Sequence, residues 1–498
     1  MRVTITSIFF LIVGLTSIFS FYFNLYFPIM LSLIITVITL FFFTIRFNKN
    51  KAGLLICLIF GIYLLPFIHI VPFIFFDFNI YPKPDQLWWW DGYPVEYTLG
   101  YMIDESTIKL TAMLGATGAL GFAFGNSLIN KKIVLDIGYN PNGTKRLIPT
   151  MSFPFWLLWA LIGLSLGFLA AAKTSIFEEN YTLSKSVVDS LNFSSAGMIY
   201  MSILTFLFAD ALLDCKKNKT KIKLSIIILL YVIIWLELLR GEREAIPWIL
   251  GLFIAYRYWS YSYLKGEMQN IKIPWIKSII LILLLLFISM ILAYSRSQFS
   301  VLETKNLSNI FGVISQGSSE GTITFYKLFR GTWTGVMLTP LSVAGDYVKG
   351  VLDFKWGKDY LNLLLSIPPG FVAEFFGYVR PLSNLQGPAY EVTFGPGGVH
   401  LIVVKFKNFS ITGVFLISAI LSYIFSNFEY KALKKLSVIN LSFLIIFVFV
   451  TPEWLWYGDK YLMNSFIIWI ILSFFYKISL GFSYKKIKKK FKKSIQEI

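Results

Sequence analysis

The sequence predicts an all-α integral membrane protein with about twelve transmembrane helices. Of its 498 residues, 56% are hydrophobic and only 14% are charged, whereas a soluble chain carries about 25% charged residues. Apolar runs of about 20 residues, each long enough to cross about 30 Å of hydrocarbon, recur along the whole chain. Basic residues gather in alternate loops between these runs. The length therefore provides many membrane spans rather than several soluble domains.

The first apolar run is expected to be a retained span rather than a signal peptide, because it is long and aromatic and has no small-residue cleavage site. The sixth run is the weakest, since Asn192, Ser194, Ser195 and Asp210 dilute it. The expected spans lie near residues 4–23, 27–45, 53–76, 106–129, 153–172, 191–213, 223–239, 246–264, 275–295, 409–428, 437–452 and 462–481.

Lysine and arginine follow every second span, and the positive-inside rule makes that face cytoplasmic, with both termini on it. The net charge of +18 is concentrated in these loops and in the tail Lys485–Lys493. This distribution is typical of membrane flanks that contact anionic lipid, and it argues against nucleic acid as a partner. Cys57 and Cys215 offer neither a disulfide framework nor the spacing of metal ligands.

Three regions follow from this topology. Residues 1–295 form a nine-helix transmembrane region with basic cytoplasmic loops. Residues 296–408 form one long extracytoplasmic loop between helices 9 and 10, with amphipathic pieces near 336–351 and 358–367. Residues 409–498 form a three-helix region and a basic tail. A loop of that length is usually functional.

Arginines gather on the face opposite the basic loops, where charge must be solvated, paired or used. Together they form a candidate receptor for an anionic lipid headgroup: Arg240 and Arg243 in a short turn, Arg296 at the end of the ninth span, and Arg330 and Arg380 in the long loop.

The turn that holds Arg240 and Arg243 has the features of an anion site. Pro247 suits the first turn of the following helix, whose free N–H groups favour anions. Arginine side chains present planar forks that match phosphate. In the alternative interpretation, Glu242 and Glu244 neutralise the two arginines in a solvated turn. Arg296 has its own alternative as a snorkelling anchor.

His400 is the candidate general base. It follows the stretch Gly395–Gly398, which allows close backbone approach to a ligand, and an imidazole suits proton transfer near neutral pH. Glu320 and Glu391 are alternative carboxylate bases, while His69 lies inside the third span and is read as a core residue. The chain has no P-loop, no HExxH, no GxSxG and no Cys/His cluster that could hold zinc.

The topology and two stretches resemble the bacterial polysaccharide polymerases of the Wzy type, which join O-antigen and capsule repeat units and are related to the O-antigen ligases. One stretch is the turn Arg240–Glu244. The other runs from His400 to Gly413 and is similar to the ligase pattern of a histidine, an apolar helix and a glycine about thirteen residues on. Leu401 stands where many ligases have asparagine.

The resemblance implies a GT-C-like glycosyltransferase of lipopolysaccharide biosynthesis in the bacterial inner membrane. It would need no metal or cofactor, and would join repeat units carried on undecaprenyl diphosphate at the outer face, beside membrane lipids and a chain-length regulator. His400 or Glu320 would deprotonate the acceptor hydroxyl. Arg240, Arg243 and Arg296 would hold the diphosphates, and Arg330 and Arg380 the second lipid diphosphate or the glycan.

Three alternatives stay open at this point. A lipid-linked oligosaccharide flippase or other transporter also has about twelve spans, although such proteins tend to show repeat symmetry and charges at mid-membrane. Another lipid-dependent glycosyltransferase would use Asp104 or Glu105 as its base, often with a metal. A ligase that moves finished glycan onto a different acceptor is not separated from a polymerase by sequence.

Overall fold

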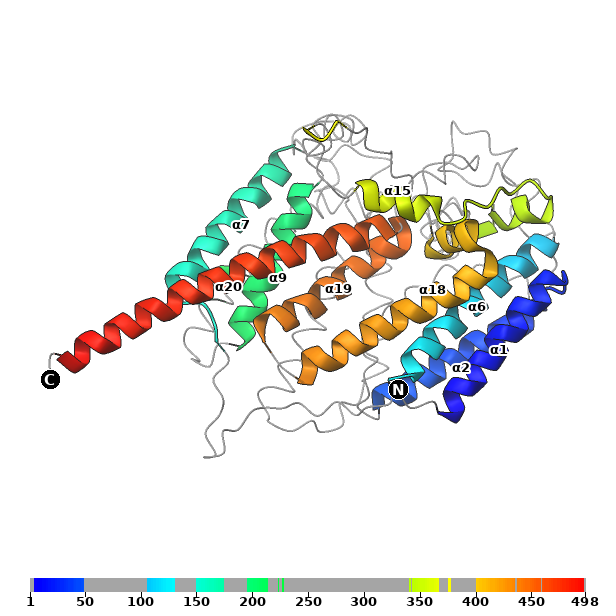
Figure 1. The fold of residues 1–498 in the computed structure, drawn as a ribbon, viewed down its shortest axis with the longest axis horizontal. Helices are drawn as coiled ribbons and strands as arrows, with labels where there is room; N and C mark the ends of the chain where they lie inside the picture. Colours follow the sequence, from blue (N-terminus) through cyan, green and yellow to red (C-terminus); the bar gives the residue numbers. More distant parts are fainter. Residues whose placement is uncertain are drawn as a thin grey trace, which may run out of the picture. The chain divides into compact units, whose positions relative to one another are not determined.

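The structure, a computed structural model, describes a part of the chain whose regular elements are all helices (Figure 1). The chain divides into two compact units, the first formed by residues 1–133, 326–431 and 450–464 and the second by residues 134–325, 432–449 and 465–498. The described residues are 4–48, 105–129, 149–173, 195–213, 223, 226–227, 340–341, 343–366, 375–377, 400–434, 437–457 and 459–496.

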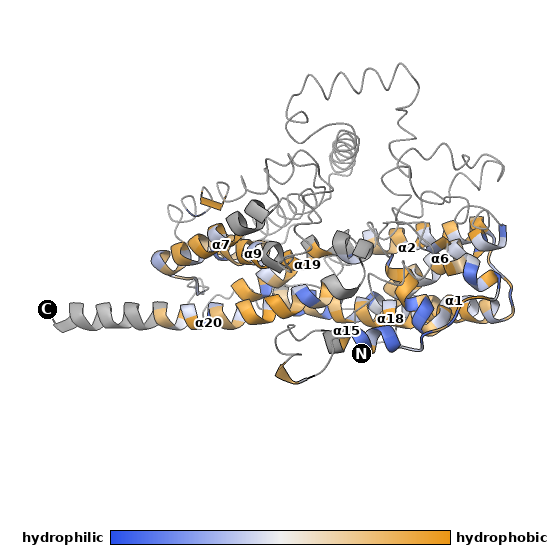
Figure 2. Ribbon diagram, turned by 90° about the horizontal axis from the view of Figure 1, so that it is seen from above, coloured by the Kyte–Doolittle hydropathy of each residue, from blue (hydrophilic) through white to orange (hydrophobic). Residues whose placement is uncertain are grey.

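Five helices within these ranges are long and apolar enough to cross a membrane, which agrees with an integral membrane protein. Figure 2 shows how strongly apolar residues predominate in them. They are α1 (Ile5–Tyr22), α2 (Ile29–Asn48), α6 (Glu105–Ser127), α18 (Leu401–Lys434) and α20 (Asp459–Gln496). Shorter apolar stretches occur in α7 (Phe153–Lys173), α9 (Ser195–Leu213) and α19 (Val438–Tyr457).

These eight helices match eight of the expected spans. Among the starts of these helices, the greatest difference is in α18, which begins at Leu401 rather than near residue 409. The expected spans 53–76, 246–264 and 275–295 lie outside the described residues, as does 223–239 apart from residues 223 and 226–227. The total of twelve and the GT-C-like arrangement therefore stay predictions.

Helix α6 is the core of the first unit, and nearly all of its residues are buried. It packs against α1 and α2 (Figure 1). Its Gly121 and Gly125 let the backbone of α18 come close, because a Cβ on either glycine would overlap a carbonyl oxygen of α18, that of Phe415 or Ala419. Small residues at this spacing are the usual means of close helix packing in membranes.

Polar side chains also join the helices of this unit. The hydroxyls of Ser17 and Thr117 lie 2.5 Å apart between α1 and α6. Between α6 and α18, Asn126 donates a hydrogen bond of 2.7 Å to the Ser426 hydroxyl. Because hydrocarbon offers no competing partner, such bonds help to fix the register of neighbouring helices.

In the second unit, α7 packs against α9, and Trp156 Nε1 donates a hydrogen bond of 3.2 Å to the Leu207 carbonyl. The parts of α19 and α20 that belong to this unit are held by the Phe443 and Trp469 rings, whose centroids are 4.7 Å apart. The basic tail predicted from the sequence continues α20 as a helix to Gln496.

Candidate functional site

His400 lies at the start of α18, and its side chain is buried. Its ring Nδ1 accepts a hydrogen bond of 3.2 Å from the N–H of Ile402, and its carbonyl accepts one of 2.9 Å from Val403. The imidazole thus serves as a helix cap, satisfying a backbone donor that the helix itself leaves unpaired. A ring nitrogen that accepts carries no hydrogen, so the neutral ring holds its proton on Nε2.

The path of α18 breaks between His400 and the end of the span. Phe409 and Ser410 have non-helical backbone angles, and Ser410 has φ 59° and ψ −166°. A residue with a Cβ rarely adopts this conformation, which costs about 1–3 kcal/mol. At Gly413 a Cβ would lie 2.9 Å from the Lys405 carbonyl oxygen and would overlap Phe409. The glycine that ends the His400–Gly413 stretch is therefore needed for the bend.

Two lysines lie buried in the short part of α18 before the break, residues 401–408. Lys405 Nζ donates a hydrogen bond of 2.8 Å to the Ser418 hydroxyl and lies 5.1 Å from the centre of the Phe122 ring. Lys407, also buried, follows His400 by seven residues, which places both on one face of a helix. Buried cations in a membrane protein are costly, so this stretch of α18 is a candidate for a site that uses positive charge.

Helix α15 (Lys358–Ser366) and the residues before it dock on the break. The Asn408 amide donates 2.8 Å hydrogen bonds to the Asp359 carboxylate and to the Val404 carbonyl, and its oxygen accepts one of 3.3 Å from the Asp359 N–H. The Tyr360 and Phe409 rings stack at 5.8 Å. Asn408 therefore caps α15 from a neighbouring helix and ties the loop to α18.

Most of the predicted site residues lie outside the described part of the chain, so their convergence stays a prediction: Glu320, Arg240, Arg243, Arg296, Arg330 and Arg380. Glu105, the base of one alternative, begins α6 and forms an ion pair of 2.6 Å with Lys109. Among the residues with described positions, no group of three or more His, Cys, Asp or Glu side chains could hold a metal ion.

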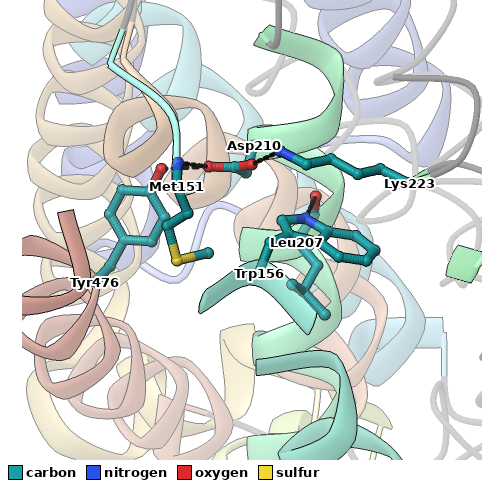
Figure 3. A network of polar contacts seen from close by, with 6 residues as sticks. All are labelled: Met151, Trp156, Leu207, Asp210, Lys223 and Tyr476. Carbon is teal, nitrogen blue, oxygen red and sulfur yellow. Dashed lines mark hydrogen bonds and ion pairs between the residues drawn. The ribbon is translucent and has the colours of Figure 1, made fainter. Parts of the chain in front are cut away.

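A second polar cluster lies in the second unit, centred on Asp210 of α9 (Figure 3). Its Oδ1 accepts a hydrogen bond of 2.6 Å from Lys223 Nζ. Its Oδ2 accepts one of 2.6 Å from the Tyr476 hydroxyl and one of 2.8 Å from the Met151 N–H. Trp156 flanks the group, with Lys223 Nζ 5.7 Å from its ring centre.

Four side chains of this cluster are almost completely buried: Asp210, Lys223, Tyr476 and Trp156. Each carboxylate oxygen of Asp210 nevertheless accepts at least one hydrogen bond from the protein. A buried carboxylate satisfied in this way indicates a structural tie between α7, α9 and α20. Sequence reasoning missed the cluster. It gave Lys223, the first residue of the expected span 223–239, no partner, whereas the structure buries it against Asp210. The available signal was a single carboxylate inside an otherwise apolar span.

Comparison with known protein families identifies the family of this chain. The profile of the family described as O-antigen polysaccharide polymerase Wzy matches residues 3–457, nearly the whole chain. The chain belongs to this family. No curated protein and no solved structure matches it.

Membership of the Wzy family confirms the resemblance inferred from the sequence. It identifies a multi-pass bacterial membrane protein that polymerises O-antigen polysaccharide, with the transferase-like activity that this implies. The substrates of such a polymerase are oligosaccharides linked to lipid in the membrane.

Proposed function

We propose that the protein joins oligosaccharide repeat units carried on undecaprenyl diphosphate, by metal-independent glycosyl transfer on the outer face of the bacterial inner membrane. The single observation that supports this most strongly is the match of the Wzy profile to residues 3–457. Both termini are cytoplasmic in this proposal, and a chain-length regulator is a further partner.

In the proposed reaction, a hydroxyl oxygen of the acceptor attacks the anomeric carbon of the growing glycan. The bond from that carbon to the phosphate oxygen breaks, and undecaprenyl diphosphate leaves with the bonding electrons. Arg240, Arg243 and Arg296 stabilise the negative charge on the leaving group. Arg330 and Arg380 hold the second lipid diphosphate or the glycan.

The proton of the attacking hydroxyl goes to His400 or Glu320. The hydrogen bond from Ile402 to His400 Nδ1 favours Glu320 as the base, because it leaves the neutral ring protonated at Nε2. His400 then donates a hydrogen bond from Nε2, either to the leaving phosphate or to a sugar oxygen. Lys407 lies on the same helix face about two turns further along and adds positive charge to that side of the helix.

The test uses the full-length protein in detergent or vesicles with one chemically defined lipid-linked repeat unit. A ladder of products should form without nucleotide and without added metal, and it should persist with a chelator. A chelator-sensitive ladder would contradict metal independence and reopen the alternative based on Asp104 or Glu105. Transfer to an unrelated acceptor without a ladder would identify a ligase instead.

A further inference from the structure

The segment 346–366 is fixed along one side to transmembrane helices. The Tyr347 ring lies 4.8 Å from that of Phe21, in the last turn of α1. The Phe354 and Phe406 ring centres are 5.8 Å apart, and the Lys355 N–H donates a hydrogen bond of 2.9 Å to the Lys407 carbonyl. The segment thus crosses the end of α1 and lies against α18, at the level where a span of the membrane finishes.

The other side of the segment is apolar and exposed. Val351, Trp356, Leu361 and Leu364 are 68%, 76%, 57% and 55% exposed. In α15, Asp359 and Tyr360 contact α18, so the helical period places Leu361 and Leu364 on the face turned away from it. These side chains lie outside the membrane spans, and water alone would leave them unfavourably solvated.

Cations accompany this apolar face. Lys349 and Lys358 are exposed, and Lys355 lies 3.6 Å from the Asp353 carboxylate. Short amphipathic helices that combine lysine with tryptophan and leucine bind in the plane of a membrane interface. Lysines near an anionic leaflet add attraction to lipid phosphates. A soluble partner would not require the apolar face to lie level with the end of a transmembrane helix.

We infer that the 346–366 segment lies along the membrane surface, with Trp356, Leu361 and Leu364 reaching the boundary between headgroups and acyl chains and with Lys349 and Lys358 on anionic phosphates. Because Asn408 and Lys407 hold the segment, this placement fixes the bend of α18 at the depth of the lipid headgroups. The inference does not depend on which glycan the protein polymerises.

The test is a depth measurement by spin labelling in vesicles of phosphatidylethanolamine and phosphatidylglycerol. Single labels replace Leu361, Leu364 or the exposed Asp353 after Cys57 and Cys215 are changed to serine. Labels at Leu361 and Leu364 should collide with oxygen several-fold more often than with a water-soluble nickel chelate. A label at Asp353 should show the reverse ratio, which makes it the matched control.

Two results would overturn the inference. If the chelate reached the labels at Leu361 and Leu364 as often as the label at Asp353, the apolar face of the segment would lie in water. Low access to both reagents would mean that protein, such as a second copy of the chain, covers it. A Lys349→Glu and Lys358→Glu double variant tests the charge component, since it should move both labels toward water by reducing attraction to phosphatidylglycerol. If the oxygen-to-chelate collision ratios stayed the same in that variant, the two lysines would not contribute to membrane binding.

Discussion

The hydroxyl of Tyr476 in α20 donates a hydrogen bond of 2.6 Å to the carboxylate of Asp210 in α9. The same carboxylate oxygen accepts from the Met151 backbone, and the other oxygen accepts from Lys223. One buried acid thus joins four separate stretches of the second unit. Since every donor is itself buried, loss of the acid would leave several polar groups without a partner in an apolar setting.

Replacement of Asp210 by asparagine should therefore destabilise the protein strongly. It leaves the Lys223 ammonium buried without its counter-charge, which costs about 3–5 kcal/mol. Tyr476→Phe removes one hydrogen bond and should cost about 1–2 kcal/mol. Thermal unfolding in detergent measures both, and Tyr423→Phe at an exposed position is the control.

A second Lys223→Met change should recover part of the loss in Asp210→Asn. An Asp210→Asn protein as stable as the parent would contradict the structural role.

The glycines of α6 give a second prediction. Gly125→Ala places a methyl group on the Ala419 backbone of α18, and overpacking of this kind costs about 1–3 kcal/mol. Gly481→Ala in α20 is the matched control, because a Cβ there meets nothing within 4 Å. We expect Gly125→Ala to lower the unfolding temperature and Gly481→Ala to raise it slightly, because alanine favours a helix over glycine by about 1 kcal/mol. Equal effects would show that α6 and α18 do not approach so closely.

The sequence predicts features that depend on a local pattern, such as a long apolar run, better than contacts between distant residues. The spans at α1, α2 and α6 are predicted within a few residues, because long apolar runs need no partner to be recognised. The sequence pattern places residues 401–408, the start of α18, in the loop, because Lys405 and Lys407 interrupt the apolar run there. The buried ammonium of Lys405 contacts Ser418, beyond the break, and Phe122 of α6, so no local period reveals its burial.

In the candidate site, too, the sequence indicates which residues matter but not which contacts they make. His400 was selected for its chemistry and for the glycines before it, but its capping of α18 depends on backbone geometry that composition does not encode. The pairing of Asp210 with Lys223 was missed because each residue was judged by its own span or loop. The five arginines and Glu320 lie outside the described residues, so their grouping still depends on the predicted topology.

The phenols near the end of α1 predict sensitivity to alkali. Burial raises the pKa of the Tyr347 phenol above its ordinary value, and Tyr22 adds to the shift. Burial likewise raises the pKa of Tyr26, with Tyr347 contributing. Well below the ordinary tyrosine pKa of about 10, both the folded and the unfolded chain keep these protons. Above it the unfolded chain loses them first, so the free energy of unfolding falls as pH rises.

Tyr347→Phe should make this alkaline loss of stability smaller, while its ring still packs on Phe21 and Phe406. The measurement is the unfolding midpoint of parent and variant in detergent at pH values of about 8 and about 11, on either side of the ordinary tyrosine pKa. The difference between the two midpoints should shrink in the variant. An unchanged difference would mean that the Tyr347 phenol does not contribute.

Two substitutions of His400 separate its role as a helix cap from its role in the reaction. Asparagine places Oδ1 where the imidazole has Nδ1, so His400→Asn keeps an acceptor for the Ile402 N–H and is a favourable cap. Glutamine instead places Nε2 where the ring has its own Nε2, so His400→Gln keeps the donor and loses the cap. Loss of the cap should cost about 1 kcal/mol of stability.

If Nε2 donates to the substrate, His400→Asn should fold like the parent yet polymerise about 100-fold more slowly, the usual effect of removing one donor to a developing negative charge. His400→Gln should be less stable but retain more of the activity per folded molecule. Unfolding in detergent and the rate of ladder formation provide the two readouts. Full activity in His400→Asn would limit the residue to capping α18. Equally severe loss in both variants, with Glu320→Gln still active, would instead make His400 the base, because neither amide can take up a proton.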